Sequence, residues 1–343
     1  MNLIVPSIFL SVFGLFNLFG LNQSLFFRQL IYCLIGFGIY FLVKSFGRHF
    51  FQINSRFFYF LFLIILIVTF IVGVEVKGSR RWLDFYFLRF QASEFFKPFF
   101  ILYMSEYLSS KDVFKNDLDL FLKSFVYFVV PFFIIFKQPD LANAATFLFI
   151  YLMIVFFSSI PKKYLTSFFG LGVLLMPLGW FFLKEYQKAR VLSFFNPHLD
   201  KQGIAYNMIQ ALITIGSGRF FGRGLGLGTQ SRLYFLPENT TDFAFASLVE
   251  QFGFFGGLFV IIFYALSIYY VARRTVKFFF DRSAEGRGKF LFCLGMLAYL
   301  TFQVFINIGM NLGLLPVAGV ALPFISYGGS SILALLIGFA LLP

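Results

Sequence analysis

The chain reads RFFYFLFLIILIVTFIVGV at residues 56–74, with a single charged residue, Arg56, at the start of the stretch. A helix needs roughly 20 mostly apolar residues to cross the hydrocarbon core of a bilayer, so this stretch predicts a transmembrane helix. The same criterion selects ten stretches: residues 3–21, 28–45, 56–74, 92–109, 121–137, 141–158, 164–183, 244–272, 289–313 and 324–342. We therefore expect an all-α polytopic integral membrane protein, with residues 1–343 in a single transmembrane domain and a long, partly ordered extracytoplasmic loop at 184–243.

The composition argues against an ordinary soluble protein. Of 343 residues, 59% are hydrophobic and 13% are charged, and the mean hydropathy is +0.85. Soluble domains average roughly 25% charged residues. The net charge of +13 therefore indicates anionic lipid headgroups and loop charges rather than nucleic acid. The two cysteines and two histidines show no metal-binding spacing and no disulfide framework.

The lysines and arginines of the loops predict an orientation. If the N-terminus is cytoplasmic, the inner loops hold fourteen of the 28 basic residues and the outer side holds the other fourteen. Seven of the outer ones lie in segment 184–243, and long segments cross the membrane largely regardless of charge. The remaining residues favour a cytoplasmic N-terminus. Because the first basic residue is Arg28, we expect residues 3–21 to be a retained helix rather than a cleaved signal peptide.

The basic residues on the outer side cluster at 75–90 and at 184–243. Two interpretations stay open, namely solvated loop charge and a site for an anionic ligand. The second segment is also apolar and aromatic, and residues 205–215 resemble a helix that is too short to span, so it lies in the membrane interface or re-enters the membrane. The glycines at 216–228 match no nucleotide-binding fingerprint.

Two carboxylates, Glu238 and Asp242, precede the predicted helix 244–272. An acidic or hydroxyl side chain at this position caps the first free amides of a helix, and spacing alone favours that role for Asp242 over a catalytic one. Glu94 and Lys97 form a second group: they are three residues apart and share a helix face, and Asp140 begins a later span. This group is either a structural ion network that locks the helices at 92–109, 121–137 and 141–158 together or a functional site at membrane depth.

A set of long motifs runs from about residue 75 to the end of the chain: Gly78-Ser-Arg-Arg-Trp82, Ser93-Glu94 with Lys97, Gln138-Pro-Asp-Leu141, Arg190-Val-Leu-Ser-Phe-Phe-Asn-Pro197, Tyr206-Asn207, Gly216-Ser-Gly218, Gly228-Thr-Gln-Ser231, Leu236-Pro-Glu238, Thr241-Asp-Phe243, Asn307 to Pro316 and Leu322 to Ser331. In these motifs and in their order, the chain resembles the SEDS family (shape, elongation, division, sporulation). Tyr206-Asn207 and the 228–231 motif are more similar to the RodA branch than to the FtsW branch. Departures are Thr240 in place of a common His, Ala142-Asn143 in place of the usual Gly-Thr, Ala92 in place of a common Pro and Gln251 in place of a second Glu.

The resemblance implies a peptidoglycan glycosyltransferase that polymerises lipid II on the outer face of the cytoplasmic (inner) membrane during cell elongation. It implies a class B penicillin-binding protein and other elongation-machinery membrane proteins as partners, and no nucleic acid. The family's essential aspartate corresponds to Asp242.

The chemistry of that reaction assigns roles to the motif residues. A sugar hydroxyl needs a base, and Asp242 serves if an apolar surround raises the pKa of its carboxyl group. The diphosphate leaving group needs cations, and arginine matches phosphate oxygens with two parallel bonds. Arg80, Arg81, Arg190, Arg219 and Arg223 are the candidates for that role. Further candidates for substrate binding are Trp82, Glu238, Thr241, Ser326 and Tyr327. A divalent cation, Mg²⁺ or Mn²⁺, with Asp242 or Glu238 as an oxygen ligand is the alternative, and no organic cofactor is expected.

Three rival functions stay open. An FtsW-like division polymerase shares the chemistry. A lipid II flippase or transporter would need a polar path across the bilayer, whereas the spans are nearly free of charge and the polar motifs gather on one side. A non-catalytic membrane scaffold would tolerate the loss of Asp242.

Overall fold

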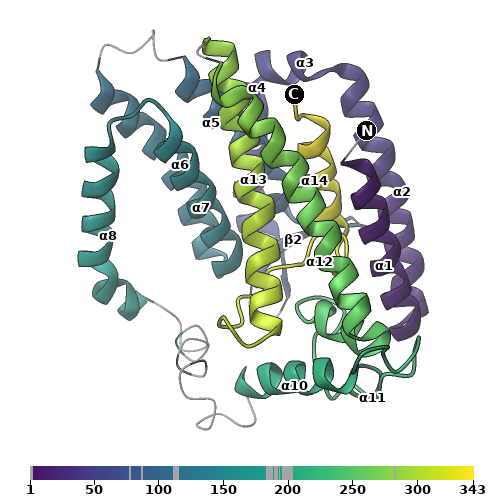
Figure 1. The fold of residues 1–343 in the computed structure, drawn as a ribbon. Coiled ribbons are helices and arrows are strands. Elements are labelled where there is room, and N and C mark those ends of the chain that lie inside the picture. The colour runs from purple at the N-terminus through teal and green to yellow at the C-terminus, as the bar shows by residue number, and fades with distance from the viewer. Residues whose placement is uncertain are drawn as a thin grey trace. The chain divides into compact units, whose positions relative to one another are not determined.

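The computed structural model describes residues 3–343 except 77–78, 86–87, 111–115, 183–187, 189–191, 193, 195–203 and 282 (Figure 1). Helices dominate the described chain. In chain order the elements are α1 Ile4–Leu21, α2 Gln23–Phe46, α3 Arg48–Ile53, α4 Ser55–Val72, β1 Val74–Val76, β2 Ser79–Phe85, β3 Leu88–Phe90, α5 Ala92–Ser109, α6 Asp117–Lys137, α7 Leu141–Phe157, α8 Lys162–Phe182, α10 Ile204–Ser217, α11 Thr229–Arg232, α12 Ala244–Phe279, α13 Ala284–Asn311 and α14 Gly329–Ala340.

Within the described residues, six helices are long and apolar enough to cross a membrane: α1, α2, α4, α6, α12 and α13. Two shorter apolar helices, α7 and α14, accompany them. The long helices present large apolar side chains outward, such as Phe57 and Ile71 of α4, which are 62% and 64% exposed. Lipid can solvate such faces, whereas water cannot. The chain is therefore a multi-pass helical membrane protein, which confirms the predicted fold class.

Residue contacts divide the chain into two compact units, each built from segments that are distant in sequence. Unit 1 comprises Met1–Leu30, Thr166–Leu266 and Gln303–Gly328, and unit 2 comprises Ile31–Leu165, Ser267–Phe302 and Gly329–Pro343. The assignment of residues 1–343 to a single domain stays a prediction.

In unit 2, α5 lies at the centre of the packing. It contacts α4, α6, α7 and α14, and nearly all of its residues are buried. The segment between α4 and α5, which the sequence predicts as a loop, instead forms a three-stranded antiparallel sheet in the order β1-β2-β3. Val74 pairs with Trp82, and Leu83 pairs with Phe90. The loop expectation missed this sheet because β1 and β3 have three residues each, and the seven residues of β2, SRRWLDF, do not alternate strictly between apolar and polar.

In unit 1, helix α12 is broken at Gly253, which adopts φ 73°. A backbone loop fills the break: Phe254 and Phe255 donate their N–H groups to the carbonyls of Arg219 and Phe220, at 2.8 and 3.2 Å. In return, the N–H groups of residues 223 and 224 donate to the carbonyls of residues 250 and 251. A Cβ atom on Gly222 would lie 2.1 Å from the Gln251 carbonyl oxygen, so the loop approaches the helix this closely only with glycine.

Candidate active site

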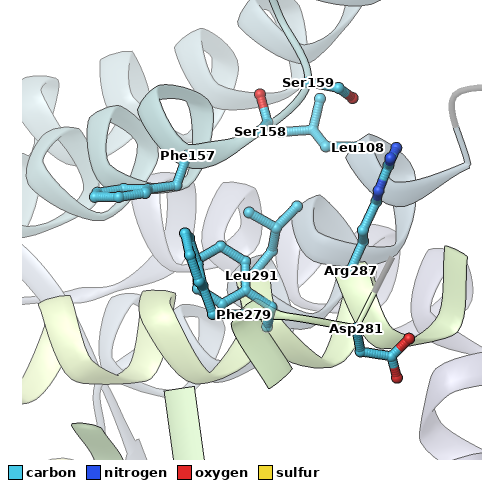
Figure 2. Close-up of a pocket in the computed structure, with 9 residues that line it drawn as sticks. Leu108, Phe157, Ser158, Ser159, Phe279, Asp281, Arg287 and Leu291 are labelled. Carbon is cyan, nitrogen blue, oxygen red and sulfur yellow. The ribbon is translucent and has the colours of Figure 1, made fainter. Parts of the chain in front are cut away.

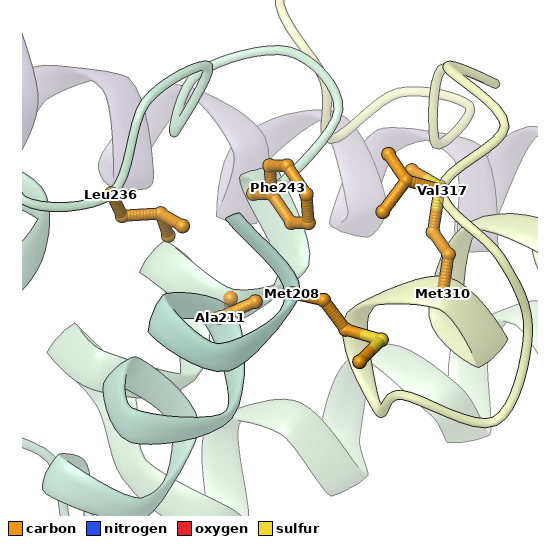
Figure 3. Packing of buried hydrophobic residues seen from close by; sticks show 7 residues of the cluster. Met208, Ala211, Leu236, Phe243, Met310 and Val317 are labelled. Carbon is orange, nitrogen blue, oxygen red and sulfur yellow. The ribbon is translucent and has the colours of Figure 1, made fainter. Parts of the chain in front are cut away.

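The predicted catalytic aspartate lies on an irregular segment, Leu236–Phe243, which we call the Asp242 arm. A buried apolar side chain, or apolar anchor, stands at each end of the arm: Leu236 is fully buried and Phe243 is 1% exposed. Figure 3 shows these two side chains in a cluster with residues of α10, α12, the end of α13 and the segment that follows α13. The other members of the cluster are Met208, Ala211, Ala246, Met310 and Val317. The arm is therefore held at both ends by burial of apolar area.

The main chain of the arm is held as well. Asn307 and Asn311, four residues apart on α13, both donate from Nδ2 to the carbonyl oxygen of Asp242, at 3.1 and 3.0 Å. The Ser326 hydroxyl donates to the carbonyl of Thr241 at 2.6 Å, and the Tyr327 N–H donates to the next carbonyl back along the arm at 2.7 Å. Three consecutive carbonyls, those of residues 240 to 242, are thus bonded to the segment from α13 to α14.

The arm turns tightly before Asp242. Glu238 adopts φ 52°, and its carbonyl accepts from the N–H groups of Thr241 and Phe243, both at 3.1 Å. The left-handed conformation costs a residue that is not glycine about 1–2 kcal/mol, so surrounding contacts must hold it. The Thr241 hydroxyl also bonds the Glu238 carboxylate at 2.9 Å. As a result the Glu238 side chain is exposed and the Asp242 side chain is half-buried, close together in sequence at the head of α12.

The proposed cap role of Asp242 has a competitor in the structure. Helix α12 begins at Ala244, and the N–H of its third residue, Ala246, donates to Asn311 Oδ1 at 3.1 Å. A capping side chain satisfies the second or third amide of a helix. Because Asn311 accepts from that third amide, this amide does not depend on Asp242 for a partner.

The arginine candidates differ in their contacts. Arg219 and Arg223 are exposed on the loop that fills the break in α12, and Arg223 Nε donates to the Ser217 carbonyl at 2.8 Å. Arg80, on β2 in unit 2, is exposed and pairs with Glu75 at 3.4 Å. Arg190 lies outside the described residues.

Arg81, next to Trp82 on β2, uses its side chain to bond other residues of the chain. Its Nε donates to the Gln138 carbonyl at 3.2 Å, it donates to the Pro139 carbonyl, and it lies 3.7 Å from Asp140 Oδ1. These contacts support a structural role for Arg81, between the sheet and the start of α7. Trp82 is half-buried in the same strand.

Glu94, Lys97 and Asp140 belong to one buried polar network in unit 2. Lys97 Nζ bonds Glu94 Oε1 at 2.5 Å, and the Tyr299 hydroxyl of α13 donates to Glu94 Oε2 at 3.2 Å. Asp140 caps α7, accepting the Asn143 N–H at 3.2 Å, and also accepts from the Gln91 side chain next to α5 at 3.1 Å. The network therefore ties α5 to α7 and α13, which favours the structural interpretation over a separate functional site.

Metal-ligating side chains are sparse. Among the residues that the structure describes, no three His, Cys, Asp or Glu side chains come together as a metal site. Mg²⁺ commonly takes one or two carboxylates together with substrate phosphates and waters. A site of that smaller kind, with Asp242 or Glu238 as ligand, stays a prediction from the sequence.

One cavity, of about 250 Å³, lies elsewhere, in unit 2 (Figure 2). Its lining combines aromatic side chains with one acid and one base, and none of the predicted site residues takes part. The lining residues are Leu108, Phe157, Ser158, Ser159, Phe279, Asp281, Arg287, Phe290 and Leu291. Cavity volume alone would therefore direct attention away from the motif residues.

Sequence reasoning assigned no role to several residues that shape the site. Asn307 and Asn311 are polar residues at helical spacing inside an apolar span, and that pattern could have singled them out. Asn17 of α1 donates to the Ala244 carbonyl at 3.3 Å, but a lone asparagine in an apolar stretch gives no indication of a partner so distant in sequence.

The comparison with known proteins decides the family. The FtsW/RodA/SpoVE family model, described as cell cycle protein, matches residues 3–343. The chain belongs to this family. The chain is 36% identical over 287 residues to the peptidoglycan glycosyltransferase MrdB of Escherichia coli K12, covering 82% of this chain and 75% of that protein. Further relatives are named probable peptidoglycan glycosyltransferase FtsW.

Two solved structures share the fold over 99% of the chain. A structure described as a peptidoglycan synthase complex that coordinates polymerization and crosslinking aligns with a TM-score of 0.82 at 27% identity, covering 99% of this chain and 95% of that one. A crystal structure of a mutant of the Thermus thermophilus rod shape determining protein RodA aligns with a TM-score of 0.72 at 25% identity, covering 99% and 94%. The resemblance to the SEDS family drawn from the motifs is thus confirmed.

Proposed function

We propose that this chain is a peptidoglycan glycosyltransferase of the RodA type, which polymerises lipid II on the outer face of the cytoplasmic membrane. Family membership and the activity named for its relatives support the reaction class. The observation that carries the assignment to a site is the Asp242 arm, in which three consecutive carbonyls are bonded and both ends are buried. Such bonds fix the main chain from which the Asp242 carboxylate projects, and proton transfer requires a positioned side chain.

The proposed reaction joins two lipid II molecules. The 4-hydroxyl oxygen of one sugar forms a bond to the anomeric carbon of the other, the bond from that carbon to the diphosphate oxygen breaks, and undecaprenyl diphosphate leaves with the electron pair. Asp242 takes the hydroxyl proton. Arg219 and Arg223, exposed on the neighbouring loop, supply charge for the diphosphate. A bound Mg²⁺ or Mn²⁺ would draw on Asp242 and Glu238 and neutralise diphosphate charge.

The partner and the cellular role follow by analogy. The similar peptidoglycan synthase complex coordinates polymerization with crosslinking, which supports a class B penicillin-binding protein as the partner of this chain. The likeness to MrdB and to RodA favours elongation, and an FtsW-like role in division is the alternative, because FtsW proteins are also among the relatives.

The decisive experiment compares wild type with Asp242→Asn, each purified with a candidate transpeptidase and incubated with fluorescent lipid II. We expect glycan polymer from wild type and at least about a hundredfold less from Asp242→Asn, because the amide cannot accept the proton. Equal thermal stability and an unchanged elution volume would show that the variant is folded.

Two outcomes would contradict the proposal. Equal polymer from both proteins would return Asp242 to a structural role. Absence of polymer from wild type, together with lipid II transport in liposomes, would favour the flippase alternative.

A further inference from the structure

We propose that Glu250 is a positioning residue for the transferase reaction: it holds the segment that leads into the Asp242 arm and so sets the place of the Asp242 carboxylate. The inference rests on the proposed function for its activity readout. Its structural part concerns hydrogen bonds within unit 1 and can be tested without substrate.

The Glu250 carboxylate is fully buried on α12 and is surrounded by donors. Oε1 accepts from the Gln230 N–H at 2.9 Å and from the Ser217 hydroxyl at 3.3 Å. Oε2 accepts from the Ser231 N–H at 2.9 Å and from the hydroxyl of the same serine. A buried carboxylate with donors on both oxygens fixes the groups that bond it, because the carboxylate and the buried Ser231 N–H would otherwise be left unpaired away from water.

These donors come from the segment just before the arm. Gln230 and Ser231 belong to α11, and Gly228 precedes them at a distance that only glycine allows, since a Cβ there would lie 2.5 Å from Glu250 Oε2. The carbonyl of Glu250 accepts from the Arg223 N–H at 2.8 Å. Glu250 of α12 thus bonds α10, α11 and the glycine-rich loop between them, which is the loop that fills the break in α12.

A ring of buried polar side chains connects Glu250 to the arm. From Ser231, the ring passes to Asn239, whose Nδ2 donates to the Ser231 carbonyl at 2.5 Å, and then to Ser247, whose hydroxyl donates to the Asn239 carbonyl at 2.8 Å. Asn17 donates to the Ser247 hydroxyl at 3.1 Å, and Gln251 donates to Asn17 Oδ1 at 2.7 Å. Gln251 adjoins Glu250, so the ring closes around the base of the arm.

The ring explains how a strained segment keeps one conformation. Tyr234 and Glu238, both between Ser231 and Asp242, adopt φ 59° and 52°. Residues other than glycine keep such conformations only where the surroundings determine them. Asn307 and Asn311 of α13 hold the chain at Asp242, which follows this stretch, and Glu250 holds the chain at Gln230 and Ser231, which precede it. Loss of the Glu250 contacts would let the stretch relax and move the Asp242 carboxylate, while leaving the apolar anchors in place.

The test is Glu250→Gln, which keeps the size of the side chain but replaces one accepting oxygen by an amide that cannot accept from an N–H. The matched control is Glu285→Gln on α13, an exposed carboxylate that pairs with Lys289, one turn along the same helix, at 2.6 Å. Both variants and wild type are purified as full chains with the transpeptidase partner, and kcat and KM for fluorescent lipid II are measured. Hydrogen exchange is followed by mass spectrometry on the same samples.

We expect kcat of Glu250→Gln to fall on the order of 10- to 100-fold, because small displacements of a catalytic group cost this much. We expect KM to change by less than about threefold, since the apolar anchors remain. Exchange at residues 229–243 should accelerate about tenfold or more, with exchange in α14 unchanged, because the loosening is local. The Glu285→Gln control should match wild type in every measurement.

Unchanged exchange at 229–243 together with unchanged kcat would overturn the inference. Faster exchange throughout the chain would show a general structural role instead of positioning, and would overturn it equally. If wild type itself makes no polymer, the proposed function fails, but the exchange measurement still decides whether Glu250 holds the arm.

Discussion

Asn311 joins the Asp242 arm to helix α12 through both ends of one amide. Its Nδ2 donates to the Asp242 carbonyl at 3.0 Å, and its Oδ1 accepts from the Ala246 N–H at 3.1 Å. Replacement by leucine fits the buried position but leaves the Ala246 N–H unpaired, at about 1–3 kcal/mol, and removes one of the two donors to the Asp242 carbonyl, which keeps Asn307. We expect Asn311→Leu to unfold at a clearly lower temperature than wild type in a detergent thermal melt. Thr301→Val is the control, because that hydroxyl bonds only the carbonyls of its own helix; equal melting of the two variants would contradict the role of Asn311.

At the same scale, the sequence predicts which residue types the site uses but not how it uses them. The Thr-Asp-Phe motif singles out Asp242, and the arm does lie at the head of a long helix. Ser326 and Tyr327, predicted to contact substrate, bond the arm through a hydroxyl and a backbone N–H. Asn307 and Asn311 reach a carbonyl more than sixty residues away in the chain. Pairings of this kind depend on tertiary packing, which residue type and spacing do not encode.

The break in α12 is the element on which the glycine-rich loop depends. Gly253 has φ 73°, and a Cβ there would lie 2.3 Å from the Gly222 nitrogen. We expect Gly253→Ala to lower the melting temperature and to reduce the yield of folded protein, because the added methyl both strains the backbone and displaces the loop. Gly38→Ala is the matched control: that glycine lies inside α2 with open space around its Cβ position, so alanine should be neutral or stabilising by up to about 1 kcal/mol. A stable Gly253→Ala protein would show that the loop does not need the break.

The ion pair between Glu94 and Lys97 offers a test of its role at the level of helix packing. Lys97 is fully buried, and its partner is nearly so. Lys97→Met alone leaves a buried carboxylate without its cation, which costs about 3–5 kcal/mol. We expect the double variant Glu94→Gln with Lys97→Met to recover most of that loss, as measured by thermal melting. Polymer formation by the recovered double variant would support a structural network; a stable but inactive double variant would establish a functional site at membrane depth.

At the scale of the whole molecule, hydropathy alone predicts the class of fold. Lipid solvates apolar surface, and it offers no hydrogen bonds, so the backbone groups of a spanning segment must bond within that segment, as they do in a helix. All ten predicted stretches overlap a helix, whereas the sheet at 74–90 and the break in α12 were not expected. Both features lie where the helical pattern stops or where glycine interrupts it. Hydropathy is averaged over a window of residues, so it detects apolar stretches but does not detect local changes of backbone direction.

The orientation of the chain in the membrane is the remaining prediction at this scale, and it can be tested with cysteine labelling. Cys33 and Cys293 are both buried, so the native chain should give little background. Arg232, on α11 in the predicted outer segment, and Lys163, at the start of α8 in a predicted inner loop, are both exposed. If the N-terminus is cytoplasmic, an impermeant maleimide should label Arg232→Cys in intact spheroplasts and Lys163→Cys only after permeabilisation. The reverse pattern would place the Asp242 arm on the cytoplasmic side, where polymerisation of an exported glycan would be excluded.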